Sequence, residues 1–475
     1  MLAQATARQA TITPELLGHD TLLPRREGPP APAIHLDYAA TTPPLRQVHA
    51  TVERFLTVYG SVHRGAGLKS QAASAAYEEA REIVGRFVGA RPAQHQVIFT
   101  RNTTEALNLL AHRLDLAPGQ IILSTELEHH SNDLPWRAVA PVHHVRVRSD
   151  GSLDLDHYAG LLRRYAGRVR LVAVSGGSNV TGMLPPIQQL AVLAHTHGAE
   201  IAVDAAQLAP HRPIHLGDLA DPAHIDYLAL SGHKLYAPYG VGALIGRADT
   251  FRHGPPLLAG GGSVRTVSAS EVVWASGPGR EEAGTPNAVG AVALAAACLA
   301  LEASGFDAIA AHEARLTAYA LTALASVPGL WIYGDPDPAT AAGRLGVIPF
   351  CLDGYDPHLV AAMLSYEAGI AVRSGSFCAQ PYVRRLLIRE PAGCEPGQPG
   401  LVRASFGLAT TCAEIDQLAT TLRAIAAGDF DGLYERHPVH GGFQPVGWEP
   451  ERHRLFQLAP AEGPGLGQGS AGRGV

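Results

Sequence analysis

Short apolar runs alternate with helical patterns through the first two thirds of the chain. Five runs have the length and composition of β-strands, at residues 97–100, 121–124, 169–174, 201–203 and 227–230. Apolar residues at helical spacing predict helices over residues 103–114 and 188–197. Strands that alternate with helices in this way favour an α/β layer built on a mainly parallel sheet.

The pattern changes after about residue 305. Helices are expected near residues 311–325, 357–368 and 413–427, and strands near 330–333, 347–352 and 401–406. This order favours a smaller α+β domain. We therefore expect an N-terminal arm at 1–33 (with room for a short helix), a large domain at 34–304, a small C-terminal domain at 305–430 and an extension at 431–475. The glycine-rich last part of the extension is expected to be disordered.

Composition agrees with a folded protein of two domains. The chain has 475 residues, of which 46% are hydrophobic and 17% charged, so it can bury a sizeable core. A formal charge of −6 argues against a nucleic-acid or anionic-membrane partner. The most apolar stretch, residues 288–301, is mainly alanine and shorter than a bilayer requires, so we expect a buried helix there.

The number and spacing of the cysteines indicate the redox state of the protein's compartment. The five cysteines are Cys298, Cys351, Cys378, Cys394 and Cys412. They form no CxxC pair, so neither a disulfide framework nor a metal site is expected. With no apolar signal core at the N-terminus, these features favour a reducing, cytoplasmic setting.

Polar residues follow every predicted strand of the large domain. In an open parallel sheet, ligands bind outside the carboxyl ends of the strands. Taken singly, each such residue has an ordinary structural reading, as a helix cap, a turn former or a surface histidine. Five polar strand ends together are better explained by a shared site. Their sequences are Asn102-Thr103-Thr104, Glu128-His129-His130, Ser178-Asn179, Asp204-Ala205-Ala206-Gln207 and Ser231-Gly232-His233-Lys234.

This set of residues matches the needs of pyridoxal 5′-phosphate (PLP). Thr103 and Thr104 begin a predicted helix, whose N-terminus favours a phosphate. A carboxylate at a buried strand end, Asp204, suits the pyridinium nitrogen. His129 offers a flat partner for the ring, and Gln207 or Asn179 offers a donor to its O3′.

The aldehyde of PLP requires an amine, and the chain contains only two lysines, Lys69 and Lys234. Lys234 follows a strand end and has Ser231 and His233 beside it as candidate phosphate ligands. Lys69 lies near the start of an amphipathic helix, where a solvated lysine is the ordinary interpretation. We therefore expect Lys234 to form the Schiff base.

The chain resembles the class V aminotransferase family, and within it the group II cysteine desulfurases and selenocysteine lyases. The resemblance covers residues 34 to about 425 and rests on an ordered set of short motifs. Besides the strand ends above, these are residues 36–42 (LDYAATT), 62–65 (VHRG), 282–287 (EAGTPN), 373–381 (RSGSFCAQP) and 403–406 (RASF).

The resemblance implies fold type I PLP architecture and a homodimer with active sites at the interface. It assigns the Schiff base to Lys234, ring stacking to His129 and the pyridinium contact to Asp204. Further implied contacts are Thr104, Gln207, Ser231 and His233 with the cofactor, Thr285 with the partner subunit's cofactor, Asn179 and Arg403 with the substrate carboxylate, and Arg373 in the substrate pocket.

The resemblance also implies a reaction in which Cys378 is the nucleophile. Lys234, once freed, would remove the substrate α-proton, and the Cys378 thiolate would attack the sulfur of L-cysteine. Alanine would leave and a persulfide would remain on Cys378, from which an acceptor protein could take the sulfur. A glycine- and serine-containing loop five residues after Arg373 suits an exposed thiolate, whereas a buried cysteine would be a small hydrophobe.

Two stretches depart from the pattern of the resembled group. Ser376 and Phe377 stand where two histidines usually precede the cysteine, and residues 176–178 (GGS) lack the usual histidine. These changes leave open another class V activity: a selenocysteine lyase, a C–S or C–N lyase, an epimerase or an aminotransferase. A non-catalytic scaffold is disfavoured by Lys234, Asp204 and Arg403, and a dinucleotide enzyme by the absence of GxGxxG around residues 240–242.

Overall fold

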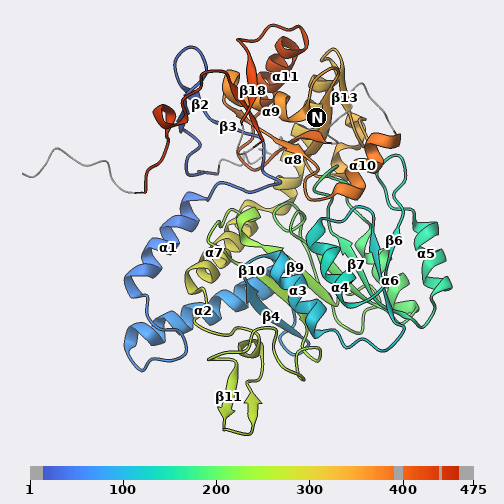
Figure 1. Ribbon diagram of the computed structural model, residues 1–475. Helices are drawn as coiled ribbons and strands as arrows, with labels where there is room; N and C mark the ends of the chain where they lie inside the picture. Colours follow the sequence, from blue (N-terminus) through green and yellow to red (C-terminus); the bar gives the residue numbers. More distant parts are fainter. Residues whose placement is uncertain (1–13, 390–399, 438–440, 459–475) are drawn as a thin grey trace, which may run out of the picture.

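A seven-stranded sheet organises the larger part of the computed structural model, which describes residues 14–389, 400–437 and 441–458 (Figure 1). In spatial order its strands are β4 (His95–Thr100), β10 (Gly242–Arg247), β9 (Tyr227–Ser231), β8 (Glu200–Asp204), β7 (Val169–Ser175), β5 (Ile121–Thr125) and β6 (Val142–Val145). Neighbours from β9 to β6 are parallel, and β10 runs antiparallel to both β9 and β4.

Side chains alternate between two apolar cores, one on each face of this sheet. Leu171, Ala202 and Leu244 point into one core, whereas their neighbours Val172 and Ile201 point into the other. This alternation follows from the two-residue period of a strand, and burial on both faces explains the nearly continuous apolar runs in the sequence.

Helices cover both faces of the sheet. The first core includes residues of α3 (Thr103–Arg113) and α4 (Leu134–Val139). The second includes residues of α1 (Arg46–Val58), α2 (Leu68–Phe87), α5 (Leu155–Arg164), α6 (Ile187–Thr196) and α7 (Ala288–Ser304). The alanine-rich α7 is buried against α1 and α2, as its composition predicted.

A second, four-stranded sheet forms the smaller part of the molecule, with its own apolar core. Its antiparallel strands are β13 (Leu330–Ile332), β14 (Val347–Leu352), β17 (Leu401–Ser405) and β16 (Arg373–Gly375). The associated helices are α8 (Phe306–Ala325), α9 (Pro357–Ala368) and α11 (Cys412–Ala426), whereas α10 (Gln380–Arg389) contributes Tyr382, Val383 and Leu386 to a core of the large sheet. A capping box formed by Thr411 and Glu414 begins α11.

Short strand pairs complete the fold. They are β1 (Leu22–Leu23) with β2 (Ala31–Pro32), β3 (Ile34–His35) with β15 (Ile370–Ala371), β11 (Val264–Val267) with β12 (Val272–Trp274), and β18 (Tyr434–Arg436) with β19 (Phe443–Pro445). The β11–β12 hairpin extends away from the rest of the molecule at the bottom of Figure 1. The pairing of β3 with β15 connects residue 34, where the resemblance to the family begins, to the smaller part of the molecule.

Most predicted elements are confirmed, with shifts of a few residues at their ends. The strands β6 and β10 were not predicted, and no helix forms in the described part of the arm, residues 14–33. One disulfide was not predicted, since Cys351 is disulfide-bonded. The predicted disorder at the C-terminus also falls outside the described residues.

Within those same residues, no single helix is long and apolar enough to cross a membrane. Helices α7 and α8 meet that criterion only as a pair, and the chain bends by 78° between them.

Candidate active site

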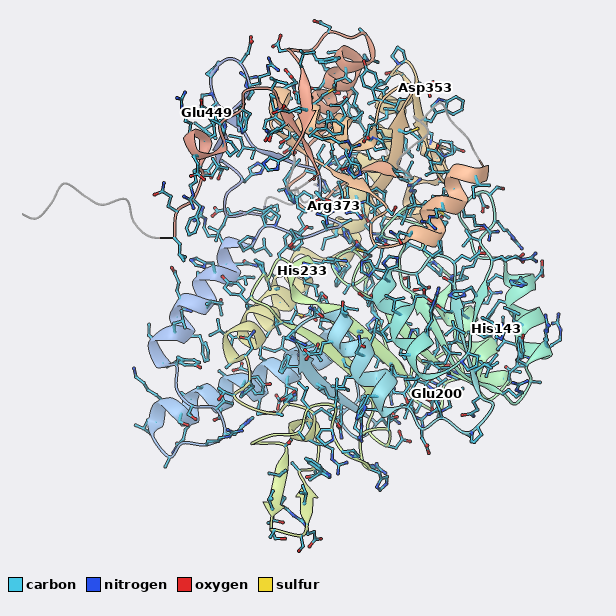
Figure 2. The ribbon with its side chains drawn as sticks, in the orientation of Figure 1. His143, Glu200, His233, Asp353, Arg373 and Glu449 are labelled. Atoms are coloured by element: carbon cyan, nitrogen blue, oxygen red, sulfur yellow. The ribbon has the colours of Figure 1, made fainter. Side chains whose placement is uncertain are left out.

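A cavity of about 460 Å³ opens where the carboxyl edge of the large sheet meets the smaller part. Figure 2 shows His233, from the large part, and Arg373, from β16, near this junction. Twelve of the thirteen predicted site residues line the cavity: Thr103, Thr104, His129, Asn179, Asp204, Gln207, Ser231, His233, Lys234, Arg373, Cys378 and Arg403.

Strand direction explains why these residues converge. Strand β10 reverses direction between β4 and β9, so β4 and β9 still end at the same edge of the sheet. Gly242, the first residue of β10, pairs with both Thr100 and Ser231. A Cβ on Gly242 would lie 2.6 Å from the Leu230 carbonyl oxygen and 2.7 Å from Asn102 Cα, so only glycine permits this close packing beside the cavity.

Hydroxyl groups surround the N-terminus of α3. Asn102 caps the helix, because its side chain accepts a hydrogen bond from Glu105 N at 3.0 Å. Ser231 Oγ accepts from Thr103 N at 2.8 Å, and Thr104 Oγ1 lies 2.7 Å from Ser131 Oγ. A helix N-terminus with several hydroxyl groups is the environment that the phosphate of PLP requires.

His129 is held as a neutral ring beside Lys234. Burial, followed by the charge of Lys234, lowers the pKa of His129 to about 3. Its Nδ1 accepts a hydrogen bond from Ser131 N at 3.1 Å, so the proton of the neutral ring is on Nε2. A neutral, oriented imidazole suits the stacking role implied by the sequence.

Glu128 anchors the segment that follows β5, a role that the sequence did not reveal. Its buried carboxyl group accepts from Asn132 Nδ2 at 2.6 Å and from Ser175 Oγ at 2.7 Å, which links β5 to β7. Burial raises the pKa of Glu128 to about 7. The only feature of the sequence that pointed to Glu128 was its position next to His129.

A buried carboxylate and an amine share the centre of the cavity. Burial raises the pKa of Asp204, whereas a hydrogen bond from Ala206 N at 2.9 Å and the charge of Lys234 oppose this rise. Burial lowers the pKa of Lys234 to about 8, with Asp204 opposing and Arg403 reinforcing the shift. A desolvated carboxylate that requires a cationic partner fits the pyridinium of PLP, and an amine that deprotonates readily fits its aldehyde.

The lowered pKa of Lys234 predicts the pH dependence of PLP uptake by cofactor-free protein. The neutral amine attacks the aldehyde, and its fraction rises about tenfold per pH unit below the pKa. The uptake rate constant, measured by absorbance after mixing, should therefore rise up to about pH 8 and then level off. A rate that continues to rise towards pH 10 would instead indicate an unshifted lysine.

The motif at residues 36–42 positions the Lys234 turn from the opposite side. Thr42 Oγ1 donates to the His233 carbonyl at 3.0 Å and accepts from Tyr236 N at 2.8 Å. Gln207 Nε2 donates to the Ala39 carbonyl at 2.7 Å. These contacts hold the Lys234 turn and Gln207 in place. The sequence indicated no structural role for this motif, only that it resembles the opening motif of the family.

A charged cluster marks the predicted substrate end of the cavity. The buried Arg403 donates from Nη1 to the Asn179 carbonyl at 2.8 Å and from Nη2 to Asp37 Oδ1 at 3.0 Å. The exposed Arg373 lies 3.8 Å from the other oxygen of Asp37. Arg403 Nε is buried and has no hydrogen-bond partner among the described residues, which leaves one donor unused. The sequence did not indicate Asp37 as the partner of both arginines.

Cys378 is exposed and lies in a tightly held loop. Phe377 and Cys378 both have left-handed backbone conformations, with φ of 51° and 52°. Two hydrogen bonds fix them: Asn179 Nδ2 donates to the Phe377 carbonyl at 2.8 Å, and His130 N to the Cys378 carbonyl at 2.7 Å. The Phe377 ring packs with its centroid 4.8 Å from the Arg403 guanidinium, so the residue that departs from the resembled pattern contacts a cavity arginine.

Two predicted or alternative residues lie elsewhere. Thr285 lines a separate cavity with Tyr77 and Asn287, so within one chain it does not reach Lys234. Lys69, the second residue of α2, is exposed. Of the two lysines, only Lys234 lies in the cavity.

Comparison with known proteins agrees with this geometry. The family model described as aminotransferase class-V matches residues 34–418. A cysteine desulfurase from Haloferax volcanii is 36% identical over 402 residues, covering 83% of this chain and 89% of the relative. A probable cysteine desulfurase from Streptomyces coelicolor is 38% identical over 405 residues, covering 82% and 92%.

Solved structures give the same result. A cysteine desulfurase from Thermococcus onnurineus has a TM-score of 0.73 at 33% identity, covering 83% of this chain and 95% of that one. A cysteine desulfurase from Escherichia coli has a TM-score of 0.71 at 31% identity, covering 84% and 96%. The cavity, its lysine and these similarities together show that the chain belongs to the class V aminotransferase family.

Proposed function

We propose that the protein is a PLP-dependent cysteine desulfurase that converts L-cysteine to L-alanine and leaves a persulfide on Cys378. The observation that carries the proposal is the exposed Cys378 thiol in the same cavity as Lys234 and Arg403. Bound PLP would supply an electron sink for charge that develops at the substrate Cα.

The residues around the cavity divide into a cofactor set and a substrate set. Lys234 would hold PLP, with Asp204 at its pyridinium, His129 against its ring and the α3 N-terminus at its phosphate. Arg403, which lines the cavity, would bind the substrate carboxylate. The amine of Lys234, with its pKa near 8, can accept the α-proton and return it to Cα.

Sulfur transfer requires the thiolate of Cys378. It attacks the sulfur of the bound substrate, the substrate Cβ–S bond breaks, and a new S–S bond forms on the enzyme. L-Cysteine and the enzyme thiol thus become L-alanine and an enzyme persulfide, with no external oxidant or reductant. The exposure of Cys378 leaves its sulfur open to an acceptor protein.

A product assay tests the proposal directly. The purified holoenzyme is incubated with L-cysteine, the products are separated, and the protein is analysed by mass spectrometry. Alanine together with a mass increase of one sulfur atom on the Cys378 peptide is expected. Pyruvate with no persulfide would instead identify a C–S lyase.

We also propose that the protein is a homodimer in which Thr285 reaches the partner's cofactor. This proposal is supported by the family and by the position of Thr285, which lies in a cavity apart from Lys234 of its own chain. Light scattering would measure the molar mass of the holoenzyme in solution. A mass of 49.9 kDa, that of one protomer, would contradict the proposed dimer.

Arg403→Ala is expected to weaken substrate binding by about 1.5–3 kcal/mol, the range for a hydrogen bond to a charged group. KM for L-cysteine should therefore rise by about tenfold or more, while the absorbance of bound PLP is retained. Arg373→Ala is the matched comparison, since it also faces Asp37 but is exposed, and its effect should be smaller. Equal KM values for the Arg403 variant and the parent would contradict the assignment.

A further inference from the structure

A second polar cluster lies at the opposite edge of the large sheet. His195 is in the last turn of α6, and His224 and Asp226 precede β9. One nitrogen from each histidine and a carboxylate oxygen of Asp226 all lie within 4.8 Å of one another. The Asp226 side chain is fully buried, and those of His224 and His195 are 8% and 16% exposed.

Backbone carbonyl groups orient both imidazole rings. His195 Nδ1 lies 2.7 Å from the Pro222 carbonyl oxygen, and His224 Nδ1 lies 2.6 Å from that of Asp221. Because a carbonyl oxygen only accepts, each Nδ1 carries a proton. In a neutral ring, Nε2 then presents a lone pair. A backbone carbonyl on one ring nitrogen and a free lone pair on the other is the usual arrangement of a metal-bound histidine.

Both lone pairs face the same carboxylate. His195 Nε2 lies 2.9 Å from Asp226 Oδ2, and His224 Nε2 lies 3.1 Å from Asp226 Oδ1. The two rings are stacked, with centroids 4.0 Å apart. A dication between the two nitrogens and the carboxylate would be attracted by all three groups.

We propose that His195, His224 and Asp226 bind a divalent transition-metal ion, with zinc as the probe of choice. Imidazole and carboxylate ligands suit zinc, and three protein ligands leave one position for water. In a tetrahedral site with metal bonds of about 2.0 Å, ligand atoms lie roughly 3.3 Å apart. The observed nitrogen–oxygen distances of 2.9 and 3.1 Å are close to this value, but the two rings are nearly parallel, so at least one of them must turn for both nitrogens to face one metal ion.

Neighbouring groups hold the carboxylate in place. Asp226 Oδ2 accepts from Ile201 N at 2.9 Å, and Oδ1 accepts from Arg247 Nη1 at 3.2 Å. Arg247 also pairs with Asp249 at 2.8 Å, so its charge is shared between two carboxylates. Rotation of Arg247 towards Asp249 alone would leave Asp226 Oδ1 available to the metal.

His95 adds an independent observation. This buried histidine lies within electrostatic range of the cluster, because the charges of His224 and Asp226 act on its pKa. Its Nδ1 accepts from Arg91 N at 3.0 Å, which places its proton on Nε2. Nε2 is buried and has no hydrogen-bond partner among the described residues.

The proposed site is separate from the cavity that contains Lys234. Asp226 precedes β9 and Ser231 ends it, so the five residues of that strand separate them by about 16 Å. In Figure 2, Glu200 marks the same edge as Asp226 and lies well away from His233. The metal would link α6 to the segment that precedes β9, so we expect it to stabilise the fold.

The test uses the full-length holoenzyme after treatment with a chelator. Zinc chloride is titrated by calorimetry, and thermal unfolding is followed with and without zinc. His195→Gln and His224→Gln should each lower zinc affinity by at least about tenfold and abolish the zinc-dependent rise in unfolding temperature. His197→Gln, one residue beyond α6 and outside the cluster, should behave like the parent.

The other outcomes overturn the proposal. Zinc affinity that is unchanged in both histidine variants would exclude this cluster as the site. A Cys378→Ala variant is titrated in parallel, because a thiolate also binds zinc. Zinc binding that disappears only in that variant would assign the metal to the active-site thiol. No measurable zinc binding to the parent would leave a network held by protons alone.

Discussion

Lys234→Ala is expected to eliminate both covalent attachment of PLP and formation of alanine from L-cysteine. The side chain lies in the cavity with Asp204, and burial lowers its pKa to about 8. Loss of a positioned general base alone lowers a rate by about 10²- to 10⁴-fold, and loss of the cofactor linkage adds to this. Reduction with borohydride followed by peptide mass spectrometry reports the linkage, and alanine analysis reports the rate.

The chain provides its own control for that experiment. Lys69 is the only other lysine, and it is exposed at the start of α2. Lys69→Ala should keep both the linkage and the rate. A Lys234→Ala protein that still incorporates reducible PLP, or a Lys69→Ala protein that does not, would contradict the assignment.

Cys378→Ser should abolish persulfide formation and lower the rate of alanine production by several orders of magnitude. A serine hydroxyl in this loop is not ionised at neutral pH, so it is a much weaker nucleophile than a thiolate. We expect no neighbouring side chain to take over the attack on sulfur. PLP absorbance should be retained, because no cofactor contact is assigned to Cys378. The measurement combines alanine quantification under single-turnover conditions with mass spectrometry of the intact protein.

Cys412→Ser is the matched control, since Cys412 is also a free cysteine and is partly accessible at the start of α11. It should leave both readouts unchanged. Parent-like alanine production by the Cys378 variant would remove the thiol from the mechanism and favour another class V activity. Pyruvate in place of alanine would favour a lyase.

Residues at strand ends could be predicted because of a simple geometric rule. The carboxyl ends of parallel strands meet at one edge, so residues as distant in sequence as His129 and Lys234 could be placed together. The shortage of lysines then selected Lys234, and the structure confirms that Lys69 lies elsewhere. The domain boundaries and the catalytic role of each residue remain predictions.

Contacts between distant segments could not be predicted from local pattern. The direction of β10 is not encoded in its apolar run, which suits either orientation in a buried sheet. Asp37 and Arg403 are 366 residues apart and meet only because the small sheet packs over the cavity. His195 and Asp226 are separated by 31 residues of ordinary composition, so neither spacing nor motif indicated the cluster.

The placement of Asp37 between Arg373 and Arg403 bears on which amino acids can enter. Two guanidinium groups and one carboxylate leave a single positive charge, which the α-carboxylate of an amino acid cancels. Aspartate or glutamate would bring a further negative charge without a counterion. We therefore expect the pocket to discriminate against dicarboxylic amino acids in favour of those with uncharged side chains.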